Sequence, residues 1–599
     1  MILLLCLLAP HDEGFLNRRV ETLSGRFLAE AKTLDDWKAK LPGLRREYLD
    51  MLGLWPLPPR TPLQAKVTGT VERGTVVIEK LHFQSRPGLY VTANLYRPAK
   101  SDGKLPAILY LCGHSNRGRD GNKTAFQDHG MWFATHGYVC LMLDTLQLGE
   151  VPGVHHGTYN LNRFHWISRG YTPAGIECWN GIRGIDYLVS RPEVDAERIG
   201  VTGISGGGAA TVWISAADER VKVAVPVSGV SDLKSYVGDR VINGHCDCMF
   251  LVNIYGWDWA TIPALIAPRP MLFANSDKDP IFPMDGNRRL MTRLREAYKL
   301  HGKPDAVEEF VSAGGHDYRP DLRKAVFRFF QRHLKGERGP KADGIEDVAD
   351  DKPLNGEQLR VFVTDDDRPK DALNAKIDEQ WLRLPRVRVP AEGEFAVWKR
   401  GMLTRLRQGP FHGLPERIAA SDAGLEKVRD GKGEPTLLVL YEGDDPRTLL
   451  TQAVKGPVWA VRVPAIPPRK QPNTLERSHV LVGTTMDRQR VERIAAAARH
   501  LAEGKGKVRG VGQEQGAVLL AYAALFEPGI AEVVAVRPTP SHLEGPHFLG
   551  ILRVLDAPTA FGLIAPRPIT LIDADKVFAT TEELAKVGKG MVRRGPGKP

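Results

Sequence analysis

Residues 198–217 read RIGVTGISGGGAATVWISAA, and this segment carries the strongest structural signal in the chain. Ile199–Thr202 is short and apolar, as a buried strand should be, and Gly206–Ala217 is rich in the small residues of a closely packed helix. Between them, Gly203-Ile204-Ser205-Gly206-Gly207 fits the pattern G-x-S-x-G. A serine on a sharp turn between a strand and a helix is exposed at the edge of a sheet, so Ser205 is predicted to be a nucleophile.

Strands and helices alternate on both sides of this segment. The predicted strands are Thr75–Glu79, Leu89–Tyr96, Ala107–Leu111, Tyr138–Leu143, Val221–Val227, Met271–Ala274 and Val307–Val311. The predicted helices are Gly175–Val189, Gly286–Leu300 and Arg319–Leu334. This alternation indicates a doubly wound, mostly parallel sheet that is covered by helices on both faces.

A nucleophilic serine needs a base, and the base needs an acid that orients it. His316 follows the last of these strands in SAGGHDY, and Asp279 follows the strand before it in NSDKDPIFP. Asp277 is the rival acid, but the spacing from Ser276 and the following PIFP favour Asp279. The chain order Ser, Asp, His is that of the α/β-hydrolase fold, which the sequence therefore predicts.

Two backbone amides are needed to stabilise an oxyanion. Gly206 opens the helix after the serine, and His114 lies in the loop CGHSN that follows Ala107–Leu111. We predict that the N–H groups of Gly206 and His114 form the oxyanion hole. For the side chain of His114, a packing role in the loop is an equally good interpretation.

The second half of the chain repeats part of this pattern. Leu265–Pro270 (LIAPRP) recurs as Leu563–Pro568, and each copy follows a strand, a Gly-rich turn and an Ala-rich helix. A duplication explains this better than chance, so a second, degenerate α/β-hydrolase-like domain is expected. Its predicted elements are the strands Thr436–Tyr441, Val458–Val463, Val508–Val511, Ile530–Val536 and Ile569–Ile572 and the helices Met486–Leu501 and Gly516–Phe526.

This second copy is predicted to be non-catalytic. Where the serine turn belongs, it reads Gly512-Gln513-Glu514-Gln515-Gly516, with Glu514 in place of serine. The given sequence ends sooner after Leu563 than His316 lies after Leu265, which leaves no room for a final strand and a histidine. Residues 510–516 could alternatively be a dinucleotide fingerprint, but no acidic partner on a following strand supports this, and no cofactor is predicted.

Changes in composition suggest the domain boundaries. Residues 1–60 are an apolar start and a helical segment, and residues 61–335 form the catalytic α/β-hydrolase domain. Residues 336–425 are expected to be a linker with connecting strands, because they begin with a polar stretch rich in helix breakers. Residues 426–599 are the degenerate repeat.

Composition and charge exclude several classes of protein. The hydrophobic share of 42% and the charged share of 26% are those of globular chains. The net charge of +11 is spread over 599 residues without zinc-finger spacing or a basic stripe, so no nucleic-acid partner is expected. The apolar run Met1–Ala9 is too short to span a membrane and resembles the core of a signal peptide without its basic start. Secretion or export to a periplasm is the expectation, with a cytoplasmic location as the alternative.

The cysteines do not predict a disulfide scaffold or a metal centre. Six cysteines are too few for such a scaffold, and Cys112, Cys140 and Cys178 lie in apolar or helical segments. Cys246-Asp247-Cys248 follows His245 and could suggest a metal site. No second Cys/His pair at ligand spacing accompanies it, so no metal is predicted.

At these motifs the chain resembles acetyl xylan esterases and cephalosporin-C deacetylases, above all the large two-module acetyl xylan esterase-like proteins. The resemblance covers about residues 45–335 and rests on Asp50–Pro98, CGHS, the stretch 176–213, LIAPRPMLFANSDKDPIFP and SAGGHDY. It implies removal of acetyl groups from sugar hydroxyls, with Ser205 as nucleophile, His316 as base and Asp279 as orienting acid. Many of these deacetylases have Gln where this chain has Gly206, and their H-G-Y loop here reads C-G-H.

The predicted function is therefore that of a serine esterase acting on a small-molecule or polysaccharide ester such as acetylated xylan. A peptidase of the prolyl oligopeptidase type shares the fold and the triad order, but the residues before the predicted sheet are too few for its propeller. A third hypothesis makes the second half a non-catalytic module that binds polysaccharide or a partner. The oligomeric state stays open.

Overall fold

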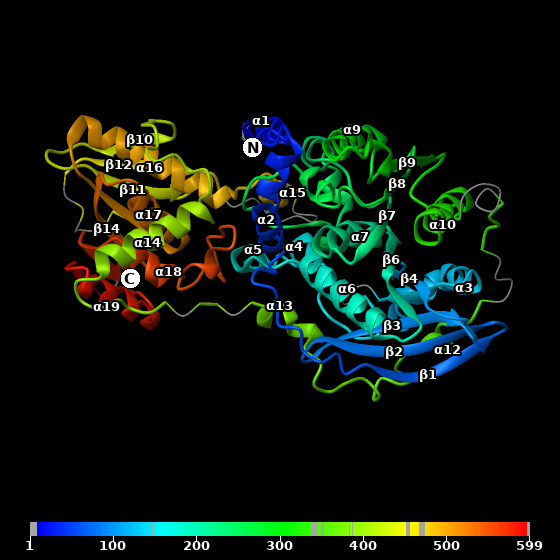
Figure 1. Ribbon diagram of the computed structural model, residues 1–599. Coiled ribbons are helices and arrows are strands. Elements are labelled where there is room, and N and C mark those ends of the chain that lie inside the picture. The colour runs from blue at the N-terminus through cyan, green and yellow to red at the C-terminus, as the bar shows by residue number, and fades with distance from the viewer. Residues whose placement is uncertain are drawn as a thin grey trace.

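The computed structural model describes residues 9–144, 148–337, 344–348, 353–382, 384–385, 387–450, 454, 456–465 and 474–595, with the backbone alone at 9–13 and 504–505. These residues form two α/β modules, each with its own sheet and hydrophobic core (Figure 1). The predicted apolar start lies outside the described residues except for Ala9. Among the described helices, none has the length and apolar character needed to cross a bilayer.

The first module is built on a nine-stranded sheet with the order β1-β2-β3-β5-β4-β6-β7-β8-β9. Strand β2 pairs antiparallel with β1 and with β3, and β3 pairs antiparallel with β5. From β5 to β9 all pairs are parallel, as predicted for an α/β-hydrolase. The bounds are β1 Lys66–Arg73, β2 Val76–Arg86, β3 Leu89–Pro98, β4 Leu105–Leu111, β5 Val139–Leu143, β6 Val194–Ile204, β7 Val221–Val227, β8 Met271–Ser276 and β9 Val307–Ser312.

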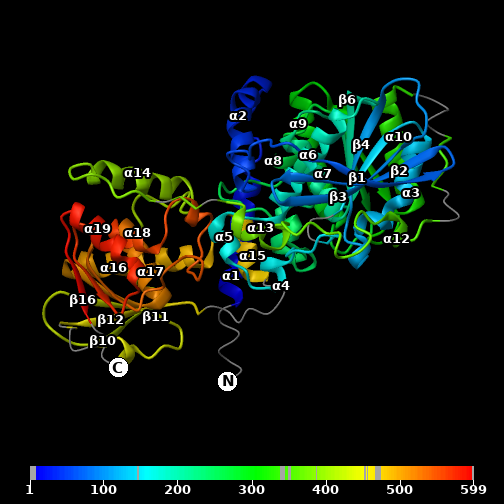
Figure 2. The same ribbon diagram turned by 90° about the horizontal axis from the view of Figure 1, so that it is seen from below.

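Helices cover both faces of this sheet, so its central strands are buried on both sides (Figure 2). In β4, Leu109 belongs to the core beneath α6, α7 and α9, whereas Tyr110 belongs to the core beneath α3 and α10. On the second face the rings of Trp132 and Phe327 stack with centroids 3.8 Å apart. The bounds are α3 Gln127–Thr135, α4 Gly157–Asn160, α5 His165–Arg169, α6 Pro173–Ser190, α7 Gly206–Ala217, α8 Thr261–Ala264, α9 Met284–Leu300 and α10 Pro320–Lys335.

Two N-terminal helices, α1 Ala9–Ser24 and α2 Leu34–Met51, precede this sheet and lie between the modules in Figures 1 and 2. Thr33 ends the break between them, because its side chain caps α2 by accepting a hydrogen bond from the N–H of Asp36 at 3.2 Å. Tyr48 of α2 donates to the carbonyl of Trp213 at 2.8 Å, inside the first core. The helical segment is therefore part of the first module's packing.

The segment between the two sheets packs partly on the first module and partly on the second. The described residues of 336–424 contain the helices α12 Gly356–Leu359, α13 Ile377–Gln380 and α14 Phe395–Gln408 and no strand, and the strand β10 begins at Leu425. Residues 353–382 pack on the first module, where the buried carboxylate of Glu150 accepts the N–H groups of Val361 at 2.7 Å and Phe362 at 2.8 Å. Helix α14 packs on the second module. Tertiary partners, rather than local composition, decide these conformations.

The second module has a seven-stranded sheet with the order β10-β12-β11-β13-β14-β15-β16. Its last strand pairs parallel with β15, so the prediction that a final strand has no room is wrong. This strand, β16, has four residues and follows the short helix α19, and it completes the sheet. The bounds are β10 Leu425–Arg429, β11 Thr436–Tyr441, β12 Val458–Val463, β13 Val508–Gln513, β14 Ile530–Val536, β15 Ile569–Ile572, β16 Val592–Gly595, α15 Thr474–Leu481, α16 Met486–Lys505, α17 Glu514–Phe526, α18 Ala557–Gly562 and α19 Ala579–Val587.

The two modules share their strand order and the role of the repeated hexapeptide. The order β5-β4-β6-β7-β8-β9 corresponds to β12-β11-β13-β14-β15-β16. Arg269 of the first LIAPRP donates to the carbonyls of Ser215 at 2.6 Å and Val221 at 2.8 Å. Arg567 of the second donates to those of Ala524 and Ile530, both at 2.7 Å. In each module the arginine ties the helix after the sharp turn to the next strand.

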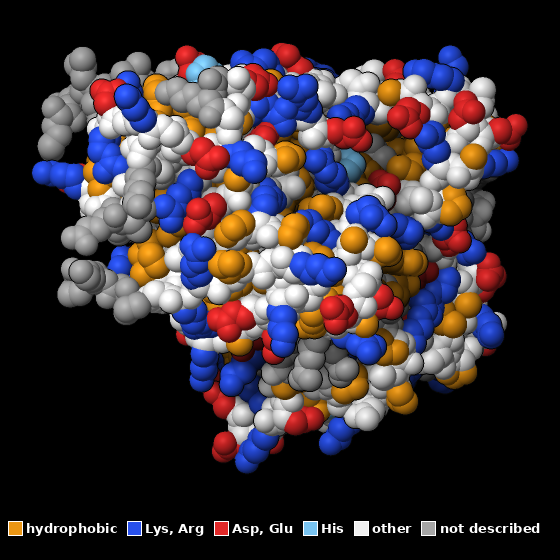
Figure 3. Space-filling model, turned by 90° about the vertical axis from the view of Figure 1, so that its left-hand side faces the viewer, with side chains coloured by type: hydrophobic (Ala, Val, Ile, Leu, Met, Phe, Trp, Pro, Cys, Tyr) orange, Lys and Arg blue, Asp and Glu red, His pale blue; other side chains and the backbone are white. Residues whose placement is uncertain are grey.

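Charged side chains of both signs are mixed on the face of the second module that Figure 3 shows. Lys and Arg side chains lie between Asp and Glu side chains across this face, rather than in one stripe. The Lys and Arg side chains on this face are therefore solvated surface charges rather than a binding stripe.

Helix α15 belongs to the second half of the chain but packs against the first module. Its Arg477 is fully buried and donates to the carbonyls of Ile242 at 3.2 Å and His245 at 2.8 Å. Its guanidinium group also lies 3.9 Å from the buried carboxylate of Asp247. The second half thus supplies a buried cation to the loop that follows β7.

Replacing Arg477 with methionine should lower the free energy of unfolding by about 3–5 kcal/mol, because the carboxylate of Asp247 would stay buried without its counter-charge. Urea denaturation of the full chain measures this. Arg417→Met is the matched control, since Arg417 pairs with Glu503 at the surface with 75% of its side chain exposed. That control should cost less than about 1 kcal/mol. Equal losses in the two variants would contradict the prediction.

Candidate active site

Ser205 stands on the predicted sharp turn between β6 and α7. Its backbone angles are φ 60° and ψ −122°, a conformation that residues other than glycine rarely adopt. Gly203 and Gly207 permit the turn, because a Cβ atom on them would lie 2.2 Å and 2.0 Å from the carbonyl oxygen of Leu111. The N–H of Ser205 donates to the carbonyl of Val227 at 3.0 Å, which fixes the turn against β7.

The predicted histidine and acid contact each other at the same edge of the sheet. Ser205, Asp279 and His316 follow β6, β8 and β9, and these parallel strands end at one edge. Nδ1 of His316 lies 2.7 Å from Oδ2 of Asp279. The other oxygen of Asp279 accepts the N–H groups of Ile281 and Phe282, each at 3.0 Å. The Phe282 ring stacks on the imidazole with centroids 5.6 Å apart, so the histidine is held from two sides.

The protonation of this pair follows from its surroundings. Burial alone would raise the pKa of Asp279, but the hydrogen bond and charge of His316 and the two backbone N–H groups lower it below the usual value. The ionised carboxylate can only accept hydrogen bonds, so Nδ1 of His316 carries the proton. In the neutral imidazole Nε2 is then the acceptor, which is the form that a general base requires.

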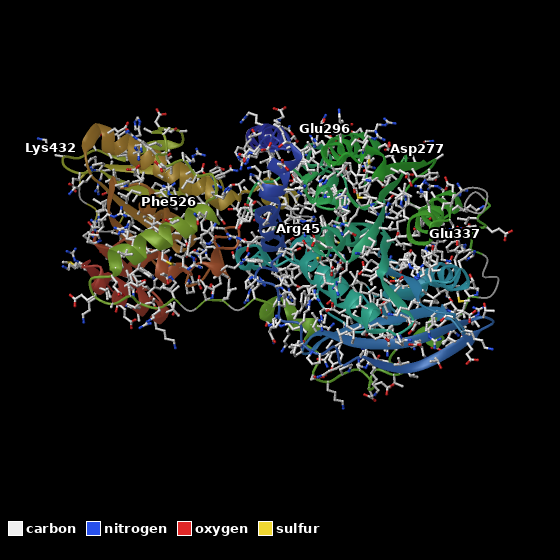
Figure 4. The ribbon with its side chains drawn as sticks, viewed as in Figure 1. Arg45, Asp277, Glu296, Glu337, Lys432 and Phe526 are labelled. Carbon is white, nitrogen blue, oxygen red and sulfur yellow. The ribbon has the colours of Figure 1, made fainter. Side chains whose placement is uncertain are left out.

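The alternative acids have other roles in the structure. Asp277, labelled in Figure 4, accepts the N–H of Gly314 at 2.7 Å and thereby shapes the turn before His316. Asp317 accepts the N–H of Tyr318 at 2.7 Å. The carboxylate bonded to His316 is that of Asp279.

The two predicted oxyanion donors border the serine turn. A Cβ atom on Gly113 would lie 3.4 Å from Cβ of Ser205, so the loop that carries His114 runs directly past the serine. Gly206 is the first residue of α7, and its N–H therefore has no partner within the helix. The positive end of the α7 dipole also points to this position.

A cluster of histidine and cysteine side chains lies beside this turn. Donor atoms of His114, His155, Cys246 and Cys248 all lie within 4.8 Å of one another. The Nε2 atoms of the two histidines are 2.9 Å apart, and Nε2 of His155 is 3.3 Å from Sγ of Cys246. The two sulfurs are 2.7 Å apart.

Sequence reasoning named the cysteine pair but missed its neighbours. His245, adjacent to the pair in sequence, points elsewhere and contacts the carbonyl of Ile281 at 2.7 Å. His114 and His155 come from two other loops, so linear spacing does not reveal them. The C-x-C motif was the one usable signal.

The corresponding turn of the second module carries Glu514. This residue has φ 50° and opens α17, just as the turn at Ser205 leads into α7. Its carboxylate is exposed and lies 3.5 Å from a guanidinium nitrogen of Arg537. The sequence after Leu563 contains no histidine. The second module therefore keeps the shape of the turn without a serine nucleophile.

Comparisons with known proteins support the same class. Residues 67–235 match the acetyl xylan esterase family, and residues 175–337 match the prolyl oligopeptidase family. The putative hydrolase YtaP of Bacillus subtilis (strain 168) is 26% identical over 302 residues, which are 48% of this chain and 98% of that protein. The 4-O-methyl-glucuronoyl methylesterase of Phanerochaete carnosa is 27% identical over 186 residues, 26% of this chain and 45% of that protein. The solved structure of methylesterase BT1017 covers 61% of this chain and 79% of its own, with a TM-score of 0.50 and 23% identity.

The strand order and the serine turn define the first module as an α/β-hydrolase. Within that class the first module resembles acetyl xylan esterases over residues 67–235, and the chain is a serine ester hydrolase. The resemblance expected from the motifs is thereby confirmed.

Proposed function

We propose that this protein is a carbohydrate esterase that removes acetyl groups from sugar hydroxyls, with acetylated xylan as its substrate class. Ser205, His316 and Asp279 form its catalytic triad. One observation carries this proposal: the serine on its strained turn and the hydrogen-bonded His316–Asp279 pair follow strands that end at one edge of the sheet. The acetyl group is taken from the family match.

The reaction proceeds in two steps. Nε2 of His316 takes the proton of the Ser205 hydroxyl as its oxygen attacks the ester carbonyl, and the amides of Gly206 and His114 bind the oxyanion. The bond to the sugar oxygen breaks, and the sugar hydroxyl leaves with the proton from His316. Water then loses a proton to His316 and attacks the acetyl-serine, which releases acetate and restores the serine hydroxyl.

The second module is proposed to be a non-catalytic duplicate that supports the first. Its strand order, its arginine anchor and the positive φ of Glu514 correspond to the first module. Its helix α15 inserts Arg477 behind the loop that follows β7. Structural support explains this contact without a second active site.

A substrate panel tests the proposed function. Acetate release from acetylated xylan should exceed, by at least about tenfold in kcat/KM, both methanol release from a methyl glucuronoyl ester and cleavage of an aminoacyl p-nitroanilide. The methyl ester represents a second candidate, which the match to a glucuronoyl methylesterase favours. The anilide represents the prolyl oligopeptidase match. If methanol release were the fastest of the three reactions, the proposed substrate would become a uronate ester instead of an acetyl ester. If anilide cleavage were the fastest, the esterase proposal would be overturned.

A further inference from the structure

The cluster of His114, His155, Cys246 and Cys248 unites side chains from three separate loops. His114 follows β4, His155 precedes α4, and the cysteines follow β7. His155, Cys246 and Cys248 are buried, whereas His114 is exposed. Two imidazoles and two thiols with all donor atoms within 4.8 Å match the donor set of a tetrahedral zinc ion.

We propose that these four residues bind one zinc ion, or a similar borderline-soft divalent cation, beside the serine turn. Zinc bonds of about 2.0–2.3 Å to nitrogen and sulfur place neighbouring donor atoms about 3.3–3.8 Å apart. The contacts of Cys246 Sγ with His155 at 3.3 Å and with His114 at 3.5 Å are close to this. Binding requires the two sulfurs, now 2.7 Å apart, to separate by about 1 Å and the two Nε2 atoms, now 2.9 Å apart, by about 0.4 Å.

The surroundings of the cluster fit such a site. His155 directs Nε2 to the cluster, and its Nδ1 lies 3.8 Å from the buried carboxylate of Glu177. At 3.8 Å this is not a direct hydrogen bond, but a small shift would let Nδ1–H donate to the carboxylate, as ligating histidines around protein-bound zinc usually do. Arg477 holds the cysteine loop from its other side by donating to the carbonyls of His245 at 2.8 Å and Cys246 at 3.3 Å.

The glycine after the serine is a second observation that points to this site. A Cβ atom on Gly206 would lie 3.2 Å from Cε1 of His114 and 3.3 Å from Sγ of Cys248. Those are closer than most contacts of a Cβ atom, so the histidine and cysteine occupy the space that a side chain there would need. The cluster and the G-x-S-x-G turn are thus built against each other.

Four protein ligands leave no coordination position for substrate, so the ion has a structural role. It ties the loop of His114 to the loop after β7 and to the segment before α4. On the proposed function, it thereby holds the oxyanion loop in place. The metal content itself can be measured without reference to catalysis.

The test is the metal content of the full chain, purified under reducing conditions and dialysed against zinc-free buffer. About one zinc per chain is expected by elemental analysis, and cobalt-loaded protein should show the thiolate charge-transfer and visible bands of tetrahedral Co(II). Cys246→Ser and His114→Ala should each lose the metal and these bands. His114 is exposed, so its replacement keeps the test valid if the buried variant fails to fold. Cys140→Ala, a buried cysteine in β5, is the matched control and should retain the ion.

Thermal unfolding gives an independent readout. Zinc added to the metal-free chain should raise the midpoint of unfolding for the wild type and for Cys140→Ala, but not for Cys246→Ser, because an ion stabilises only the state that binds it. Wild-type protein without zinc and without a zinc-dependent shift would overturn the proposal. So would a Cys246–Cys248 disulfide, seen by intact mass, that forms in place of the metal site.

Discussion

Replacing Ser205 with alanine is expected to lower kcat/KM for p-nitrophenyl acetate by about 10⁴- to 10⁶-fold. The variant keeps the turn and the His316–Asp279 pair but has no oxygen to form the acyl-enzyme. The remaining rate would come from the backbone amides at Gly206 and His114 and from substrate binding. Initial rates of p-nitrophenol release measure the effect, with circular dichroism to show that both proteins are folded.

Glu514→Ala is the matched control for this variant. Glu514 also has a positive φ at the corresponding turn of the second module, 50° against 60° for Ser205. Both substitutions therefore place alanine at a positive φ. The control should keep activity within about twofold of the wild type. Full activity in Ser205→Ala would place the nucleophile elsewhere, and an equal loss in Glu514→Ala would show that the effect comes from the scaffold.

The buried parallel strands were predictable from the sequence because they are continuous apolar runs. Val221–Val227 and Thr436–Tyr441 have the predicted bounds. Strand β1, Lys66–Arg73, was not predicted, since KVTGTVER lies at the exposed edge of the sheet and has no buried residue. Strand β16 was missed for a similar reason: it has four residues, of which two are arginines. Edge strands depend on a neighbour for their conformation, and the neighbour is not visible in the sequence.

Some residues of the candidate site could be predicted from the sequence and others could not. The turn at Ser205 has a local signature, because its glycines are required by the close approach of Leu111. Asp279 and His316 could be placed because the order of elements in this fold fixes the strands after which the acid and the base occur. The histidine–cysteine cluster could not, since His114 and His155 are separated from Cys246 by long stretches of chain and meet only in the folded protein.

Replacing Asp279 with asparagine is expected to lower kcat by about 10⁴-fold with a much smaller change in KM. The amide has nearly the same shape but carries no charge, so it neither fixes the proton on Nδ1 of His316 nor stabilises the imidazolium that forms during attack. Asp277→Asn is the control. An asparagine there can still accept the N–H of Gly314, so activity should stay within a fewfold of the wild type. A large loss in Asp277→Asn and a small one in Asp279→Asn would exchange the roles of the two acids.

The Asp279→Asn variant should also differ from the wild type in how its free energy of unfolding depends on pH. The pKa of Asp279 is lowered in the folded protein, so its carboxylate stabilises the fold above its unfolded-state pKa of about 3.9. That contribution is lost as the pH falls from there through the folded-state pKa. The difference in unfolding free energy between wild type and Asp279→Asn, measured by urea denaturation, should therefore shrink as the pH falls below about 4. A difference that grew as the pH fell below about 4 would mean that the folded protein holds Asp279 in its protonated form, which is incompatible with Nδ1 of His316 donating to a carboxylate.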